Sequence, residues 1–114
     1  MIIKRLEDAP IVENAHEVDA RNLYSKEAVS ITVIALEPGE SLKRHITPVD
    51  VAFYVLDGEG LVEIGDEKER VVSGSLVESP KDIVHCWRNE SCHVLRFMVI
   101  KSPRPTSKTV LLED

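Results

Sequence analysis

The sequence predicts an all-β domain, a sandwich or barrel built from short strands. Runs rich in β-branched residues recur about every 8–12 residues, and glycines, prolines and aspartates separate them. No segment shows the period of about 3.6 residues that marks an amphipathic helix. With 114 residues, 43% of them hydrophobic and 30% charged, the chain has the size and composition of one globular domain with its own core.

From residue 29 onward the strand pattern is clear, and each expected strand ends at a turn. They cover residues 29–36, 42–46, 51–56, 61–64, 69–72, 76–78, 83–87, 93–100 and 109–112. The turns include Pro38-Gly39, Asp57-Gly58 and Ser79-Pro80, which favour chain reversal. The single domain, residues 1–114, therefore has its core at about 29–101, with residues 1–28 and 102–114 as extensions packing on or near the barrel.

The first 28 residues carry the weakest pattern. Ile2-Ile3 and Ile11-Val12 are expected to start short strands, with a break between them at Ala9-Pro10. His16 falls in a polar run and is expected in a solvated loop. Residues 22–28 are interpreted as a loop or a turn of helix.

The charge and the cysteines limit the classes of partner. A net charge of −6 argues against nucleic acid, because binding there depends on Lys and Arg that neutralise phosphates. No apolar run approaches the length of a membrane span, and residues 1–8 lack the apolar core of a signal peptide. A cytoplasmic location is therefore expected. Cys86 and Cys92 are then expected to be reduced, structural cysteines.

Two stretches in the middle of the chain each begin at a glycine and contain one histidine. The first reads Gly39-x5-His45-x-Thr47-x3-Val51-x6-Gly58, and the second reads Gly74-x5-Pro80-x-Asp82-x2-His85-x3-Asn89. They resemble the two motifs of the cupin family, over about residues 29–100. The second motif departs only at Asp82, where cupins usually have glycine. The resemblance implies a small jelly-roll β-barrel of two packed antiparallel sheets and a single-domain cupin of type-2 character.

The resemblance also implies where a metal would sit, and the first motif is degenerate there. Cupins with a metal present two histidines and a carboxylate from the first motif and one histidine from the second. Those positions are His45, Thr47, Val51 and His85 here. Threonine is a poor ligand and valine is none, so two imidazoles remain where zinc usually has three protein ligands and non-haem iron has two histidines and a carboxylate.

Two further residues are candidates to complete a site with His45 and His85. Asp50 lies next to the expected carboxylate position, but strand alternation points it the other way unless a bulge shifts the register. His93 begins a strand whose alternate residues are apolar, so it is either an interior ligand near His85 or a histidine at the end of the sheet. Cys86 follows His85 directly and is expected on the opposite face.

Alternation also predicts the lining of a pocket. His45, Thr47, Val51, Phe53 and Val55 have one parity and can share the inner face. His85 and Trp87 share a face of their own strand. The expected pocket residues are therefore Thr47, Val51, Phe53 and Trp87, with Trp87 either a pocket wall or a core residue.

Three functions remain open, and whether the protein is an enzyme stays undecided. The leading hypothesis is a barrel that binds a small molecule and keeps a degenerate or weak metal site. The first alternative is a metal-dependent dioxygenase or isomerase with iron, manganese, nickel or zinc on His45 and His85. The second is a metal-free isomerase or epimerase with a histidine general base. The resemblance further implies a homodimer, which suits strands that are apolar on both faces.

Overall fold

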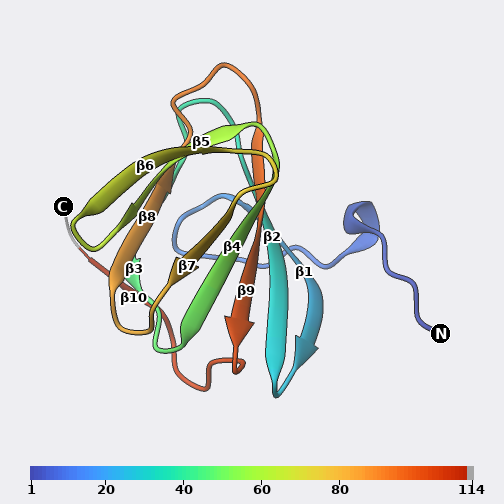
Figure 1. Ribbon diagram of the computed structural model, residues 1–114. Coiled ribbons are helices and arrows are strands. Elements are labelled where there is room, and N and C mark those ends of the chain that lie inside the picture. Colours follow the sequence, from blue (N-terminus) through green and yellow to red (C-terminus); the bar gives the residue numbers. More distant parts are fainter. Residues whose placement is uncertain (113–114) are drawn as a thin grey trace.

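The computed structural model describes residues 1–112 and shows two antiparallel sheets packed face to face (Figure 1). The first sheet has the strand order β1-β2-β9-β4-β7 and the second has the order β10-β3-β8-β5-β6. The strands are β1 (Asp19–Lys26), β2 (Val29–Leu36), β3 (Ser41–Ile46), β4 (Asp50–Asp57), β5 (Glu59–Ile64), β6 (Glu67–Val72), β7 (Leu76–Ser79), β8 (Val84–Arg88), β9 (Leu95–Ser102) and β10 (Val110–Leu111). The all-β, two-sheet prediction is confirmed. No helix of the described chain is long and apolar enough to cross a membrane.

Aromatic side chains from both sheets fill the core between them. Trp87 of β8, Phe53 of β4 and Phe97 of β9 are fully buried. The rings of Trp87 and Phe97 stack with centroids 4.4 Å apart, and Phe53 meets Trp87 edge-on at 5.3 Å. Strand alternation therefore places these residues inward as predicted. Trp87 and Phe53 nevertheless fill the core and do not line a pocket.

The N-terminal part of the chain differs from the sequence prediction. The loop or helical turn expected at residues 22–28 is wrong, because Asp19–Lys26 forms β1 and pairs antiparallel with β2. The strand has no β-branched residue and half of its residues are exposed, so pairing with β2 and not local propensity decides its conformation. Ile2-Ile3 forms no strand, since a short 3-10 helix at Leu6–Asp8 is the first regular element. Ile11 makes only an isolated bridge to Arg21.

A β-bulge in β3 lets two inward side chains sit three residues apart. Leu42 lies opposite Trp87 and His45 lies opposite His85, so β3 has one more residue than β8 between these two pairs. Leu42 and His45 are both buried, while Lys43 and Arg44 are exposed. A bulge leaves backbone groups of the extra residue without partners in the neighbouring strand. The backbone groups of Lys43 instead hydrogen-bond to histidine side chains of the site.

Two turns have backbone conformations that the sequence explains. Gly58 has φ +83°, and a Cβ there would lie 2.5 Å from the carbonyl oxygen of Val94, so glycine is required. Asp82 has φ 64° in the turn before β8. Aspartate tolerates this left-handed conformation better than most residues with a Cβ, which accounts for the departure from glycine. The Asp82 N–H donates to the carbonyl of Thr47 at 2.9 Å and ties the two motifs together.

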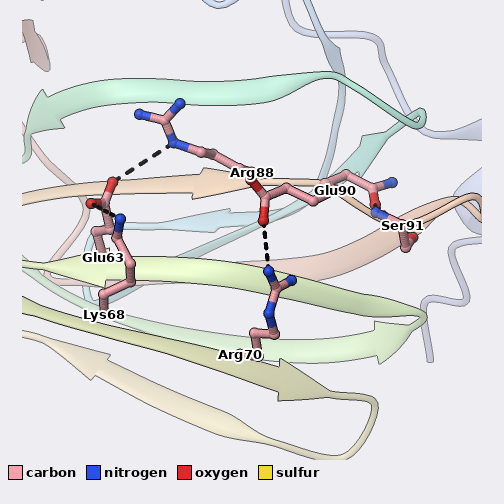
Figure 2. A network of polar contacts seen from close by, with 7 residues as sticks. Glu63, Lys68, Arg70, Arg88, Glu90 and Ser91 are labelled. Atoms are coloured by element: carbon pink, nitrogen blue, oxygen red, sulfur yellow. Dashed lines mark hydrogen bonds and ion pairs between the residues drawn. The ribbon is translucent and has the colours of Figure 1, made fainter.

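The outer face of the second sheet carries paired charges (Figure 2). Glu63 lies 3.4 Å from the ammonium of Lys68 and 3.8 Å from the guanidinium of Arg88. Figure 2 also shows the ion pair of Arg70 with Glu90, at 2.9 Å. Cys86 points to this face, away from the neighbouring His85 as alternation predicts, and its thiol donates to Glu63 at 2.7 Å.

Cys86 and Cys92 are both free thiols in the described chain. Cys86 is buried and Cys92 is exposed. Burial and the Glu63 hydrogen bond raise the pKa of Cys86 to about 11, so this thiol stays protonated at neutral pH. Its protonated form favours a structural role over a metal-ligating one.

Candidate site at the histidine cluster of the barrel

The two histidines of the motifs face each other on neighbouring strands. His45 of β3 and His85 of β8 are paired in register, and their Nε2 atoms are 2.9 Å apart. Both rings are buried, with 6% and 2% of their surface exposed. Phe53 contacts the far side of His85, with centroids 5.2 Å apart. The fold therefore brings together the two candidate ligands, which are separated by forty residues in the sequence.

The hydrogen bonds of His45 and His85 determine which ring nitrogens carry a proton. The Nδ1 of His45 lies 2.5 Å from the carbonyl oxygen of Lys43, which can only accept, so this nitrogen carries the proton and Nε2 is a lone-pair acceptor. His85 then donates from Nε2 to His45, and its Nδ1 accepts from the Ser79 hydroxyl at 2.6 Å. The Thr47 hydroxyl lies 3.2 Å from the same Nε2 of His85. Both imidazoles are therefore neutral. Their hydrogen bonds run in one direction, from the Ser79 hydroxyl through His85 and His45 to the Lys43 carbonyl.

A third histidine joins the cluster from the N-terminal segment. His16 is half-buried, not solvated as the sequence predicted, and its ring lies edge-on to His45 with centroids 4.7 Å apart. Its Nδ1 accepts the backbone N–H of Lys43 at 2.8 Å. Nothing local in the sequence signals this role, because the contact depends on the bulge in β3 and on how residues 12–18 cross the barrel.

Burial keeps the cluster uncharged at neutral pH. Desolvation, with a smaller contribution from His45, lowers the pKa of His85 to about 3. The same causes lower the pKa of His16 to about 4. Desolvation also lowers the pKa of His45, although the hydrogen bond to Lys43 opposes it. A neutral imidazole can accept a hydrogen bond or bind a metal, but with these lowered pKa values the three rings are weak bases.

The cluster opens into a cavity of about 360 Å³. Its wall is made by both sheets, by residues 12–16 of the N-terminal segment and, near the C-terminus, by Lys108, Thr109 and Leu111. The apolar part consists of Val12, Ala15, Ala20, Ile34, Leu42, Val99 and Leu111. Of the expected pocket residues, Thr47 lines the cavity. Val51, Phe53 and Trp87 lie outside the lining and are buried in the core.

The two additional candidates do not reach the histidine pair. Asp50 is exposed at the start of β4, and its carboxylate accepts the backbone N–H of Lys81 at 2.9 Å. No bulge turns it inward, because the shift of register in β4 lies between Val55 and Asp57. His93 is exposed and precedes β9, where its carbonyl accepts from Asn89. Neither residue lines the cavity.

The donor set can be compared with what a metal requires. Two ring nitrogens that bind one metal at about 2.1 Å are about 3.0 Å apart at a right angle and about 3.4 Å apart at a tetrahedral angle. The 2.9 Å between the Nε2 atoms fits the first arrangement. Over residues 1–112, however, no group of three or more His, Cys, Asp or Glu side chains is placed to hold a metal. Among the described residues, His45 and His85 therefore offer two donors, which is fewer than a metal site usually has.

Comparisons with known proteins agree with this fold. A model of the cupin domain, Cupin_2, matches residues 32–101. The uncharacterized protein MJ0764 of Methanocaldococcus jannaschii is 29% identical over 84 residues, which cover 73% of this chain and 72% of that protein. The crystal structure of TT1209 from Thermus thermophilus is 29% identical, with a TM-score of 0.79 over 92% of this chain and 100% of that one.

A further solved structure shares the fold at lower identity. The polyketide cyclase RemF of Streptomyces resistomycificus is 19% identical and has a TM-score of 0.84, over 99% of this chain and 86% of that one. At this identity the likeness concerns the fold alone. The family model, by contrast, spans most of the chain and contains both histidine motifs. The protein therefore belongs to the cupin family, as a small cupin with one Cupin_2 domain.

Proposed function

We propose that this cupin binds a small molecule in the cavity of its barrel and that His45 and His85 are the remainder of a degenerate, weak metal site. The observation that carries the proposal is the cavity itself. It measures about 360 Å³, has an apolar wall and receives polar groups from several separate elements. Ligand pockets have this size and this mixture of surfaces.

The weakness of the metal site follows from the ligand count. Two protein ligands leave a divalent transition metal to be completed by water or by a bound molecule, whereas three or four protein ligands are usual. Thr47 and Val51 supply no strong donor, and within the described residues no carboxylate takes their place. Affinity for iron, manganese, nickel or zinc is therefore expected to be low.

A metal-dependent enzyme is the second candidate, and one observation favours it. Each imidazole is oriented through Nδ1, by the Lys43 carbonyl or by the Ser79 hydroxyl, with Nε2 directed at its partner. Metal-binding histidines are commonly held in this way. A metal here would polarise a bound substrate. Catalysis by a free histidine base has less support, because a pKa of about 3 makes His85 a poor base near neutral pH.

The first experiment is metal analysis of protein purified without a polyhistidine tag, followed by a thermal-shift screen of small metabolites. We expect far less than one metal per chain, together with ligands that raise the melting temperature. His45→Ala and His85→Ala test the pair, and His93→Ala is the matched control because that histidine is exposed and outside the cavity. Near-stoichiometric metal that is lost in the first two variants and kept in the control would overturn the degenerate site. A screen without any hit would count against the binding function.

The homodimer implied by the family resemblance is also proposed. The outer face of the first sheet presents a row of half-buried apolar side chains, namely Ile31, Ala52, Tyr54, Met98 and Ile100. The register places Ile100 between Ile31 and Ala52, and Met98 beside Tyr54, so these side chains form one continuous patch. Such a face supports covering by a second copy of the chain.

A further inference from the structure

One cation of the barrel interior has no role in the site described so far. Along β9 the inward positions alternate as Leu95, Phe97 and Val99, and the next residue of the same parity is Lys101. Lys101 is half-buried and lines the same cavity as the three histidines. A lysine at an inward position of a barrel strand is unusual, because a buried charge costs free energy unless it is paired.

Within residues 1–112, Lys101 has no partner of opposite charge. Among residues 1–112, neither an ion pair nor a side-chain hydrogen bond includes its ammonium. Its neighbours across the sheet are Ser30 on β2 and Val51 on β4, which carry no charge. The contrast with the outer face is clear, since Lys68, Arg70 and Arg88 all have carboxylate partners there (Figure 2).

The charges that line the cavity are predominantly positive, although the chain as a whole carries −6. The charged lining residues are Lys101, Lys108 and Glu13, and the carboxylate of Glu13 is exposed on the N-terminal segment. Burial lowers the pKa of Lys101, and its charge in turn lowers the pKa of His16, His45 and His85. The ammonium of Lys101 and the three imidazoles therefore influence one another, and a negative charge is favoured beside them.

The rest of the lining limits the shape of such an anion. Ile34, Leu42 and Val99 form an apolar wall, and the hydroxyls of Thr32 and Thr47 add neutral hydrogen-bonding groups. A fully hydrated inorganic anion cannot use the apolar wall. A carboxylate on an apolar body can place its charge at the lysine and bury its remaining surface.

We propose that Lys101 is the anchor for the ligand of this barrel and that the ligand is a small carboxylic acid with an apolar body. This inference rests on the proposed binding function and specifies its ligand class. The ammonium of Lys101 pairs with the carboxylate, and the uncharged imidazoles border it. The ligand supplies the negative charge that no side chain of the described barrel provides to this lysine.

The test compares hexanoate with its neutral isostere hexanamide, by NMR titration of the backbone amides of the full chain. We expect hexanoate to bind about 10- to 100-fold more tightly, the usual range for a hydrogen-bonded charge. In Lys101→Met the preference should vanish while the binding of hexanamide is kept. Lys26→Met is the matched control, because Lys26 lies exposed at the end of β1 and outside the cavity. Methionine suits a half-buried position, so the variant should fold.

The outcomes separate the two proposals. Equal binding of hexanoate and hexanamide, or a preference that survives in Lys101→Met, overturns the anchor and leaves the binding function standing. If neither hexanoate nor hexanamide shifts the amide signals of residues that line the cavity, both the Lys101 anchor and the binding function are overturned. Inorganic phosphate is the third probe. If it binds as tightly as hexanoate, the apolar body is not recognised and the ligand class is wrong.

Discussion

His16 and His45 are held against each other by one bulged residue of β3. The N–H of Lys43 donates to Nδ1 of His16 at 2.8 Å, and its carbonyl accepts from Nδ1 of His45 at 2.5 Å. In a regular strand both backbone groups would be engaged by the neighbouring strands. Because of the bulge, the N–H and the carbonyl of Lys43 hydrogen-bond to two imidazoles. These bonds connect the N-terminal segment to the motif histidines.

The first prediction concerns acid stability. The pKa of His85 is lowered to about 3 in the folded protein, against 6.5 for the ordinary side chain, so only the unfolded state takes up its proton between these values. The free energy of unfolding is therefore unaffected by this group above pH 6.5 and decreases as the pH falls from 6.5 toward 3. At pH 4.5 the wild type should have lost about 3 kcal/mol through this group.

Urea unfolding at pH 7 and at pH 4.5 measures this loss, and comparison with His85→Gln isolates it from the carboxylates that also titrate. The variant should show a smaller drop than the wild type. His93→Ala is the control, because this histidine is exposed and makes no side-chain contact with the cluster. An equal drop in wild type and His85→Gln would show that the ring is not desolvated.

The second prediction concerns Ser79, whose hydroxyl donates to Nδ1 of His85 at 2.6 Å and is buried. Ser79→Ala removes the donor and leaves a buried ring nitrogen unsatisfied, so it should lower the free energy of unfolding by about 1–3 kcal/mol. Ser102→Ala is the matched control, since that hydroxyl makes an exposed hydrogen bond to the Ala28 carbonyl. Denaturant unfolding at pH 7 is the measurement, and losses of similar size in both variants would contradict the assigned chain of hydrogen bonds.

The third prediction rebuilds the metal site. Thr47 lies beside His85, and Val51 is buried on the inner face of β4, so Thr47→His together with Val51→Glu should add two ligands to the pair. Manganese or zinc affinity measured by calorimetry should rise by at least about tenfold. Asp50→Glu with Thr47→His is the control, because Asp50 points outward. No gain over the parent protein would show that Val51 is not aimed at the histidines.

The fourth prediction addresses the proposed homodimer. Ile100→Lys places a charge within the apolar patch on the first sheet, and the mass in solution should fall from two chains to one by light scattering. Val72→Lys is the control, because Val72 is apolar and exposed on β6, in the other sheet. A wild type that is monomeric at micromolar concentration would remove the basis for the proposal.

The barrel strands after residue 29 could be predicted because their information is local. Period-2 alternation and frequent turn residues determine which side chains of β4 and β8 face inward. Burial alternates along β4, and in β8 the Cys86 thiol between His85 and Trp87 contacts Glu63 on the outer face. The residues at which the strands begin and end are less well determined by local sequence. The strand expected at 93–100 runs from Leu95 to Ser102, and the shift places Lys101 within β9, facing the cavity.

Local sequence determined that this protein is a cupin-type barrel with one histidine in each of two motifs. The tertiary structure decided the rest of the site. It pairs β1 with β2, bulges β3, and carries His16 and Lys101 to the same cavity as His45 and His85. These contacts join residues far apart in the chain and depend on register, and no short pattern in a sequence encodes the register between distant strands.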